Sequence, residues 1–281
     1  MKIRFGAAGN PDSFYAAGYR SSLQMPAYLA SLGLNAYEYQ LSRGVRISEK
    51  MARQLGEEAV KHDVLLSVHA PYYINFASPD PQIQASSREH LLKSVEAARW
   101  LGAQRVVFHP GGAARMERET AVQLVRERLQ EVIAILEDRG WTDVYLCPET
   151  MGKKNQVGTL AEVIEFCQFS PMLLPCVDFG HLNALLQGEL ETEAGMNRVL
   201  EDLASGLGPD VLSKLHVHFS PVEYTTGGEK RHATVADGIP PDFRWLVPGL
   251  KAWKATPVII CESAGTQAED ACHYRDLYLE G

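Results

Sequence analysis

Six apolar runs in this chain each end on a histidine or a carboxylate. The runs are VLLSVH, RVVFH, VYLCPE, LLPCVD, LHVH and VIICE, and they close on His69, His109, Glu149, Asp178, His218 and Glu262. Successive runs are separated by about the length of one strand plus one helix. In a closed parallel barrel all strands run in the same direction, so their C-terminal ends meet on one face. The pattern therefore predicts that six side chains able to bind metal converge on that face.

Eight stretches of the chain have the composition of buried strands. They are residues 3–7, 36–39, 64–69, 105–109, 144–149, 173–178, 214–218 and 258–262. Several are nearly continuous Val, Ile and Leu, which is typical of strands covered on both sides. A length of 281 residues suits either two small domains or one barrel. The regular alternation of strands and helices, with no internal repeat or linker, predicts a single (β/α)8 TIM barrel over residues 1–281.

Helix patterns with recognisable ends fill the intervals between these strands. Thr159 and Glu162 form a capping-box pattern ahead of an apolar stretch. Pro26 suits the first turn of a helix that stops at Gly33. Gly102 stands where a helix C-cap is needed before the fourth strand.

Two long segments on the predicted C-terminal face carry no helix or strand pattern. They cover residues 70–87 and 219–241, and the second contains GGEKRHATVADG. Loops of this length inside a compact domain are usually functional or disordered. Because they follow the third and seventh strands, we expect them to contact the substrate.

Charge and cysteine content limit the classes of function. The net charge is −8, which does not indicate a nucleic-acid partner, although a local basic rim around a cleft is invisible to a sum. The 5 cysteines show no Cys-x-x-Cys spacing, which disfavours a thiolate zinc site and suits a reducing cytoplasm. The N-terminus has no signal-peptide pattern and no apolar stretch is long enough to cross a bilayer, so we expect a cytoplasmic protein without a membrane span.

The residues at the strand ends are those that zinc and similar cations bind. Such ions take neutral imidazoles and ionised carboxylates as ligands. His69 and His109 offer nitrogen ligands from neighbouring strands, and Glu149 on the next strand can bridge two ions. Asp178 and His181 lie three residues apart after the sixth strand and can face different ions.

Two more ligands complete the predicted set. Glu262 comes from the eighth strand, and His232 lies in the second long loop and can fold over the top of the barrel. The total exceeds the three or four protein ligands of one zinc, which implies two or more ions. Two ions about 3.5–4 Å apart can hold the attacking and leaving oxygens of a phosphoryl displacement.

Each of these residues, taken alone, has a simpler interpretation. A single histidine in an apolar strand is more often a hydrogen-bonded core residue, and a single carboxylate after a strand often caps a helix. The coincidence of six strand ends favours the metal site. His216 and His218 share one face of the seventh strand, because side chains alternate. We expect His218 to be the ligand, and His216, which lies deeper, either to support a ligand or to belong to the core.

Seven segments of the sequence resemble the endonuclease IV family, the apurinic/apyrimidinic endonucleases of base-excision DNA repair. In order along the chain they read VHAPYYIN, FHPGG, PETMG, CVDFGH, HVHFS, KRH and CES. The resemblance implies a barrel that holds three zinc ions. It implies hydrolysis of the phosphodiester 5′ to an abasic site in damaged double-stranded DNA, by a monomeric protein. We expect zinc, as two or three ions, with manganese as the alternative metal.

The resemblance also implies a division of the ligands. The first ion would take His69, His109 and Glu149, the second Glu149, Asp178, His218 and Glu262, and the third His181 and His232. Within this set we expect Glu149 and Glu262 to be the catalytic residues. An intact Glu149 and Glu262 argue against a protein that binds nucleic acid or sugar phosphate without catalysis.

Contacts to DNA are implied at the loops. Tyr72 and Asn75 match positions in the loop that the family inserts near the lesion, although a tyrosine there can also serve loop packing. Arg43 and Arg46 follow the second strand and are candidates for phosphate contact, with a solvated charge as the alternative.

Two positions depart from the family pattern. The third site of the family has Asp-x-His, whereas this chain has Lys230-Arg231-His232. Glu229 lies one residue away and is one methylene longer, so it can supply the missing oxygen. If it does not, Lys230 or Arg231 can offer a cation to a phosphate. After the first strand the family has a histidine where this chain reads FGAAGNPDS.

The second hypothesis is a metal-dependent sugar isomerase or epimerase, because xylose-isomerase-like barrels share this fold and some ligands at the strand ends. Fold alone does not decide between the two activities. The excess of ligands, the pairing of Asp178 with His181, and His232 favour phosphodiester hydrolysis. Lys230 at the third site favours the sugar enzyme.

Overall fold

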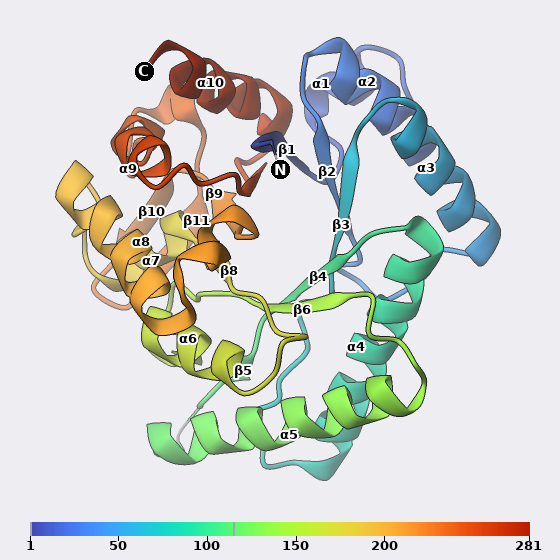
Figure 1. The fold of residues 1–281 in the computed structure, drawn as a ribbon, viewed down its shortest axis with the longest axis vertical. Helices are drawn as coiled ribbons and strands as arrows, with labels where there is room; N and C mark the ends of the chain where they lie inside the picture. The colour runs from blue at the N-terminus through green and yellow to red at the C-terminus, as the bar shows by residue number, and fades with distance from the viewer. Residues whose placement is uncertain (1, 115) are drawn as a thin grey trace.

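The computed structural model describes residues 2–114 and 116–281, and in this part of the chain eight parallel strands form one sheet that closes into a barrel (Figure 1). The strands are β1 (Arg4–Ala8), β2 (Ala36–Gln40), β3 (Leu65–His69), β4 (Arg105–Phe108), β6 (Tyr145–Pro148), β8 (Cys176–Asp178), β9 (His216–Phe219) and β12 (Val258–Cys261). Their order in the sheet is β6-β4-β3-β2-β1-β12-β9-β8. The eight predicted strands and the TIM-barrel fold are confirmed.

The barrel closes between β6 and β8, where isolated bridges take the place of a continuous ladder. Leu146 pairs with Leu173, and Glu149 pairs with Cys176. The Thr150 amide donates to the Cys176 carbonyl at 3.0 Å, and the Leu174 amide donates to the Leu146 carbonyl at 3.0 Å. This irregular pairing explains why β8 begins at Cys176, three residues later than the apolar run predicts.

Helices surround the strands on the outside of the barrel (Figure 1). They are α1 (Asp12–Ala16), α2 (Met25–Ser31), α3 (Glu49–Lys61), α4 (Pro81–Leu101), α5 (Arg118–Asp138), α6 (Leu160–Gln168), α7 (Phe179–Leu185), α8 (Glu193–Leu207), α9 (Val247–Ala252) and α10 (Gln267–Glu280). The capping box of Thr159 and Glu162 is present at the start of α6. Gly102 ends α4 in the left-handed conformation, at φ 69°. None of the described helices is long and apolar enough to cross a membrane.

Both segments expected to be long loops contain regular structure, so that prediction is wrong. The segment 70–87 ends early because α4 begins at Pro81, where Asp80 caps the helix by accepting from the Gln82 amide. The segment 219–241 folds back as a hairpin of β10 (Val222–Thr225) and β11 (Gly228–His232). A second short pair, β5 (Gly111–Gly112) with β7 (Gln156–Val157), joins the loops after β4 and β6.

Alternation along the strands divides the barrel interior into layers. Residues two apart on one strand point to the same side, so Ser67 lies below His69 and His216 below His218. The upper layer, at the C-terminal ends, carries the predicted ligands. The layer beneath it is also polar, and it includes the fully buried Glu38 from β2.

Candidate metal centre

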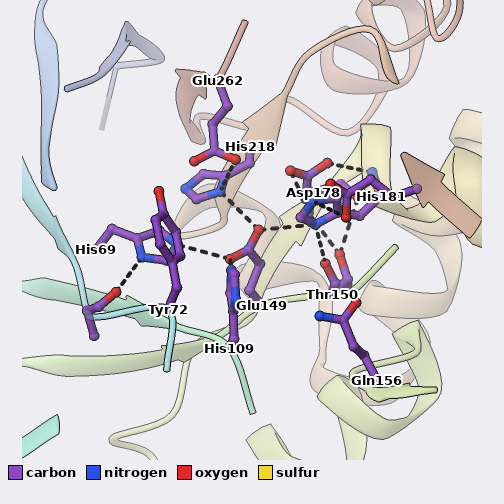
Figure 2. Close-up of polar contacts among 12 residues, drawn as sticks. His69, Tyr72, His109, Glu149, Thr150, Gln156, Asp178, His181, His218 and Glu262 are labelled. Carbon is purple, nitrogen blue, oxygen red and sulfur yellow. Dashed lines mark hydrogen bonds and ion pairs between the residues drawn. The ribbon is translucent and has the colours of Figure 1, made fainter. Parts of the chain in front are cut away.

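Glu149 stands at the centre of the site and both of its carboxylate oxygens contact imidazoles (Figure 2). Its Oε2 lies 3.2 Å from His69 Nε2 and 3.1 Å from His109 Nε2. Its Oε1 lies 3.2 Å from His181 Nδ1 and 3.3 Å from His218 Nδ1. The carboxylate itself is fully buried. Glu149 therefore contacts four histidines, which lie at or after the C-terminal ends of β3, β4, β8 and β9.

Three groups of these residues have their ligand atoms within 4.8 Å of one another. They are His69 with His109 and Glu149; Glu149 with Asp178, His218 and Glu262; and Asp178 with His181 and His232. The groups overlap at Glu149 and at Asp178. The structure therefore brings together every ligand that the strand ends predicted, in the grouping that the family resemblance implied, with Asp178 added to the third group.

The chemistry of the donors fits divalent cations. His69 donates from Nδ1 to the Ala70 carbonyl at 2.8 Å, so Nε2, which lies 3.2 Å from Glu149 Oε2, is the nitrogen that can bind a metal ion. Two lone pairs facing each other repel unless a cation or a proton lies between them. Asp178 Oδ2 is buried and has no hydrogen-bond partner within the described residues. An imidazole aimed at a carboxylate and a bare carboxylate oxygen are both accounted for by bound metal.

The buried carboxylates differ in how far the imidazoles compensate for their burial. Burial opposes ionisation of Glu149, but His109 and His218 hold its pKa well below the usual range. Burial has the same effect on Glu262, and His218 brings its pKa to about 2. For Asp178 burial dominates and raises the pKa. Ionised carboxylates held close together are the electrostatic environment that attracts divalent cations.

The third group is assembled from α7 and the hairpin. Asp178 caps α7 by accepting from the His181 amide at 2.7 Å, which fixes the spacing of the pair. His232, at the end of β11, is oriented by a 2.7 Å contact between its Nδ1 and Ser220 Oγ. Glu229 lies at the edge of this group, with Oε2 3.6 Å from His181 Nε2 and Oε1 4.0 Å from His232 Nε2.

Lys230 and Arg231 face away from the third group. Both side chains are exposed and pair with Glu223 on the neighbouring strand β10, at 2.5 Å from Lys230 and 2.7 Å from Arg231. Both side chains are thus engaged by Glu223, and the contact with a phosphate, predicted only if Glu229 does not supply the missing oxygen, stays a prediction. Alternation places Lys230, the neighbour of Glu229, on the opposite face of the hairpin. The register shift in the hairpin, where Glu223 pairs with Arg231 and Tyr224 with Glu229, interrupts the alternation before Arg231.

The two histidines of β9 have separate surroundings. His218 Nδ1 faces the upper layer, 3.3 Å from Glu149 Oε1 and 3.3 Å from Glu262 Oε2. His216 lies below and its Nε2 is 2.9 Å from Glu38 Oε2. Burial lowers the pKa of His216 to about 4, so this imidazole is neutral and donates from Nε2. His218 therefore lies within the candidate metal centre, and His216 lies beneath it.

A cavity of about 730 Å³ opens over the three groups. Tyr72 forms part of its wall, with its ring 5.3 Å from the His69 ring and 5.5 Å from the His109 ring (Figure 2). Lys153 and Gln156, from the loop after β6, line another part. Lys153 is the single Lys or Arg among the described residues that line this cavity.

The other residues predicted to contact DNA do not line this cavity. The amide oxygen of Asn75 accepts from the Gly112 amide at 3.1 Å, so this side chain ties its loop to the loop after β4. Arg43 and Arg46 line a separate depression in the loop after β2. Neither arginine lines the cavity over the candidate ligands.

Three polar residues of the site were missed by the sequence analysis. Glu38 and Gln40 lie on β2, and their spacing of two residues within AYEYQ was the available signal that both face the barrel interior. That signal was overlooked because only strand ends were considered. Lys153 follows the PETMG segment, and nothing in its spacing distinguishes it from Lys154.

Comparison with known proteins agrees with this architecture. The sequence profile of the xylose isomerase-like TIM barrel family matches residues 26–277. The chain belongs to this family. Among the relatives of this family member, an uncharacterized protein of Methanocaldococcus jannaschii is 30% identical over 94% of this chain and 92% of its own length. A protein named probable endonuclease 4 from Acholeplasma laidlawii is 30% identical over 69% of this chain and 65% of its own length.

Solved structures of other proteins share the fold with this family member. Endonuclease IV from Thermus thermophilus superposes with a TM-score of 0.74 at 19% identity, covering 99% of this chain and 100% of that one. A D-tagatose 3-epimerase-like protein superposes with a TM-score of 0.73 at 22% identity, covering 99% and 97%. A nuclease and an epimerase-like protein are thus equally similar in fold, and the choice between the activities depends on the site.

Proposed function

We propose that this family member is a metal-dependent phosphodiesterase of the endonuclease IV type, which cleaves DNA on the 5′ side of an abasic site. The observation that carries the proposal is the presence of three overlapping ligand groups that share Glu149 and Asp178. A sugar isomerase or epimerase needs fewer ions than three groups can hold. The similarity to proteins named probable endonuclease 4 supports the same interpretation, although the aligned segment spans only about two thirds of the Acholeplasma laidlawii protein.

The residues of the site suit the hydrolysis of a phosphodiester. Bound zinc or manganese would supply Lewis acidity and neutralise charge on the attacking and leaving oxygens. Glu149 would hold two ions through its separate oxygens, and Glu262 and Asp178 would complete the second set. Burial of Glu149 and Asp178 excludes bulk water from these carboxylates. The carboxylates are therefore held in place before a substrate binds.

Lys153 is the cavity residue best suited to a phosphate. Its side chain is half-exposed, and its Nζ lies 3.9 Å from Glu229 Oε2, a weak ion pair that a phosphate can replace. Tyr72 is more than half exposed and can present its ring to an unpaired nucleotide. In the proposed function Lys153 positions the phosphate and Tyr72 contacts the lesion, while Arg43 contacts the backbone of the duplex.

The second candidate is a sugar epimerase. One observation favours it: the group of Glu149, Asp178, His218 and Glu262 is sufficient by itself to hold a single ion. A cavity of about 730 Å³ also has room for a monosaccharide. The candidate leaves His69, His109 and His232 without a role, which is why we rank it second.

The deciding experiment measures metal content and incision together. The purified protein is analysed for zinc and manganese, and then incubated with a duplex carrying one tetrahydrofuran abasic analogue and with the same duplex lacking it. We expect two or three ions per chain and a single nick 5′ to the analogue. One ion, no nick and conversion of a ketohexose to its C3 epimer would overturn the nuclease in favour of the epimerase.

A further inference from the structure

Beneath the candidate metal ligands lies a second buried polar cluster, centred on Glu38 of β2. The side chain is completely inaccessible to solvent. Its Oε2 accepts from Ser67 Oγ at 2.9 Å and from His216 Nε2 at 2.9 Å. Its Oε1 accepts from Gln40 Nε2 at 3.2 Å and lies 3.1 Å from His218 Nε2. The four neighbours come from three strands, β2, β3 and β9.

A carboxylate buried this deeply is energetically unfavourable unless polar neighbours compensate for it. Burial of an unpaired charge costs several kcal/mol, and an apolar residue of similar size would fill the space without that cost. The four neighbours of Glu38 present a hydroxyl or a nitrogen to its two oxygens, so both oxygens of the side chain act as acceptors or face a possible donor. Two of these nitrogens belong to the histidines of β9.

The contact with His218 determines which ring nitrogen is free. Nε2 of His218 faces Glu38 Oε1 at 3.1 Å, in a geometry too bent to count as a hydrogen bond, so the attraction is that of an ion pair or dipole. A bare lone pair on Nε2 would be repelled by the carboxylate. Nδ1 of the same ring lies 3.3 Å from Glu149 Oε1 and 3.3 Å from Glu262 Oε2. A metal ion shared with those two carboxylates would take the lone pair of Nδ1, which leaves the ring proton on Nε2 beside Glu38.

We propose that Glu38 is a positioning residue for the metal centre, which fixes the tautomer and the ring orientation of the ligand His218. The proposal rests on the metal centre of the proposed function and not on the identity of the substrate. A carboxylate behind a ligating histidine is a general means of raising ligand basicity and aligning the ring. Here the carboxylate is itself held by Ser67, His216 and Gln40, so its position is fixed from below and from the side.

The cluster reaches the cavity wall through Gln40. Tyr72 donates its hydroxyl hydrogen to Gln40 Oε1 at 3.3 Å, and Gln40 in turn donates to Glu38. A continuous set of polar contacts thus joins Tyr72, at the surface of the cavity, to His218. A movement of Tyr72 on substrate binding would therefore shift Gln40 and, through it, the Glu38 carboxylate that orients His218.

A different assignment of the same residues is less consistent with their contacts. Cys176, His216 and His218 have potential ligand atoms within 4.8 Å and could form a separate metal site. However, Nε2 of both histidines faces Glu38, at 2.9 Å from His216 and 3.1 Å from His218. These contacts assign His216 and His218 to Glu38 and not to a separate metal site.

The test is the affinity of the metal-free protein for zinc, measured without DNA by competition with a chromophoric chelator. Glu38→Gln should weaken binding at the site that contains His218 by about 10–100-fold. Circular dichroism checks that the variant is folded. Ser67→Ala is the matched control, because it removes one partner of Glu38 and leaves the contact with His218, and its effect should be smaller.

A double-mutant cycle separates positioning from general stability. If Glu38 acts through His218, then Glu38→Gln should cost nothing further in a His218→Ala background. An equal loss in both backgrounds, or wild-type affinity in the folded single variant, would overturn the proposal. If Glu38→Gln does not fold, Glu38→Asp retracts the carboxylate and should weaken zinc binding, and unchanged affinity in that variant would overturn it equally. A wild-type chain that binds no zinc would instead refute the metal centre itself.

Discussion

At the scale of single residues, the position of Glu149 explains how one side chain can organise a site with several ions. Each oxygen faces two imidazoles at 3.1–3.3 Å, and the carboxylate is fully buried. Its neutral amide isostere has one oxygen and one NH2 group, so it cannot accept on both sides.

Glu149→Gln should therefore leave the barrel folded and lower both metal content and incision. Because the residue belongs to two of the ligand groups, we expect activity to fall by more than about 100-fold, beyond the usual effect of losing an outer partner of a ligand. Elemental analysis and the nicking assay measure the two effects. Glu137→Gln, on the exposed end of α5, is the control and should match the wild type. Wild-type incision by Glu149→Gln would exclude the bridging role.

Lys153 and its neighbour Lys154 provide a matched pair for the phosphate contact. Both side chains are exposed, but only Lys153 of this pair forms part of the cavity wall. Lys153→Ala should weaken binding of abasic duplex and reduce the slope of log affinity against log salt by about one. Lys154→Ala should change neither by as much. Fluorescence anisotropy over a salt series measures both quantities, and equal effects of the two substitutions would remove Lys153 from the phosphate site.

At the scale of elements, the hairpin β10–β11 separates charges by face. Glu229 is directed at His181 and His232, whereas Glu223 on the partner strand pairs with Lys230 and Arg231. Glu229→Gln should lower the metal content by about one ion if this carboxylate completes the third group. Glu223→Gln, on the same hairpin, should leave it unchanged. If the stoichiometry is the same in both variants, Asp178 alone supplies the carboxylate of that group.

Helix α6 carries a second element-scale prediction at its N-terminus. Glu162 closes the capping box with the amides of Gly158 and Thr159, at 2.8 and 2.9 Å, and pairs in a bidentate manner with Arg118. Glu162→Gln should lower the free energy of unfolding by about 1–2 kcal/mol at neutral pH. Denaturant unfolding measures the loss. Glu165→Gln, which disturbs an exposed pair with Arg126 on the same helix, should cost much less.

The stabilisation from Glu162 should depend on pH in a defined direction. Burial opposes the charge, but the hydrogen bonds from Arg118 and the backbone lower the pKa of Glu162 in the folded state. A lowered folded pKa means that the contribution is complete above the unfolded value of about 4.3 and is lost as the pH falls through the folded pKa. The stability difference between wild type and Glu162→Gln should therefore narrow in acid. A difference that widens in acid would contradict this linkage.

The elements also show where sequence reasoning succeeds. The strands were predictable because their apolar runs are continuous and because strand ends in a parallel barrel share one face, so the ligands at positions such as His69 and Glu262 followed from topology. The hairpin could not be predicted, because GGEKRHATVADG is polar on both faces and carries no period-two apolar pattern. The spacing of Glu38 and Gln40 indicated that both face the barrel interior, but the contacts of Glu38 with Ser67 and His216 could not be predicted, because these partners come from strands distant in the sequence.

At the scale of the whole molecule, the barrel gathers its chemistry at one end. The predicted ligands come from the ends of β3, β4, β6, β8, β9 and β12 and from the segments that follow them, and they meet only when the sheet is closed. The third group additionally requires the hairpin to fold over the top. Neither the candidate metal centre nor the cavity is formed by any isolated part of the chain.

Metal binding at the junction of β6 and β8 would stabilise the closed barrel. Glu149 follows β6, Asp178 ends β8, and the two share a ligand group across the place where isolated bridges replace the ladder. An ion held by both would act as a cross-link over the most irregular junction of the sheet, and binding restricted to the native state stabilises it. In hydrogen exchange, the amides of Thr150 and Leu174, which donate across this junction, should lose protection in a chelator before those of β1 do. Uniform loss around the barrel would contradict a local cross-link. Acquisition of metal would then be the last step of barrel closure, and metal supply would control the lifetime of the folded chain as well as its activity.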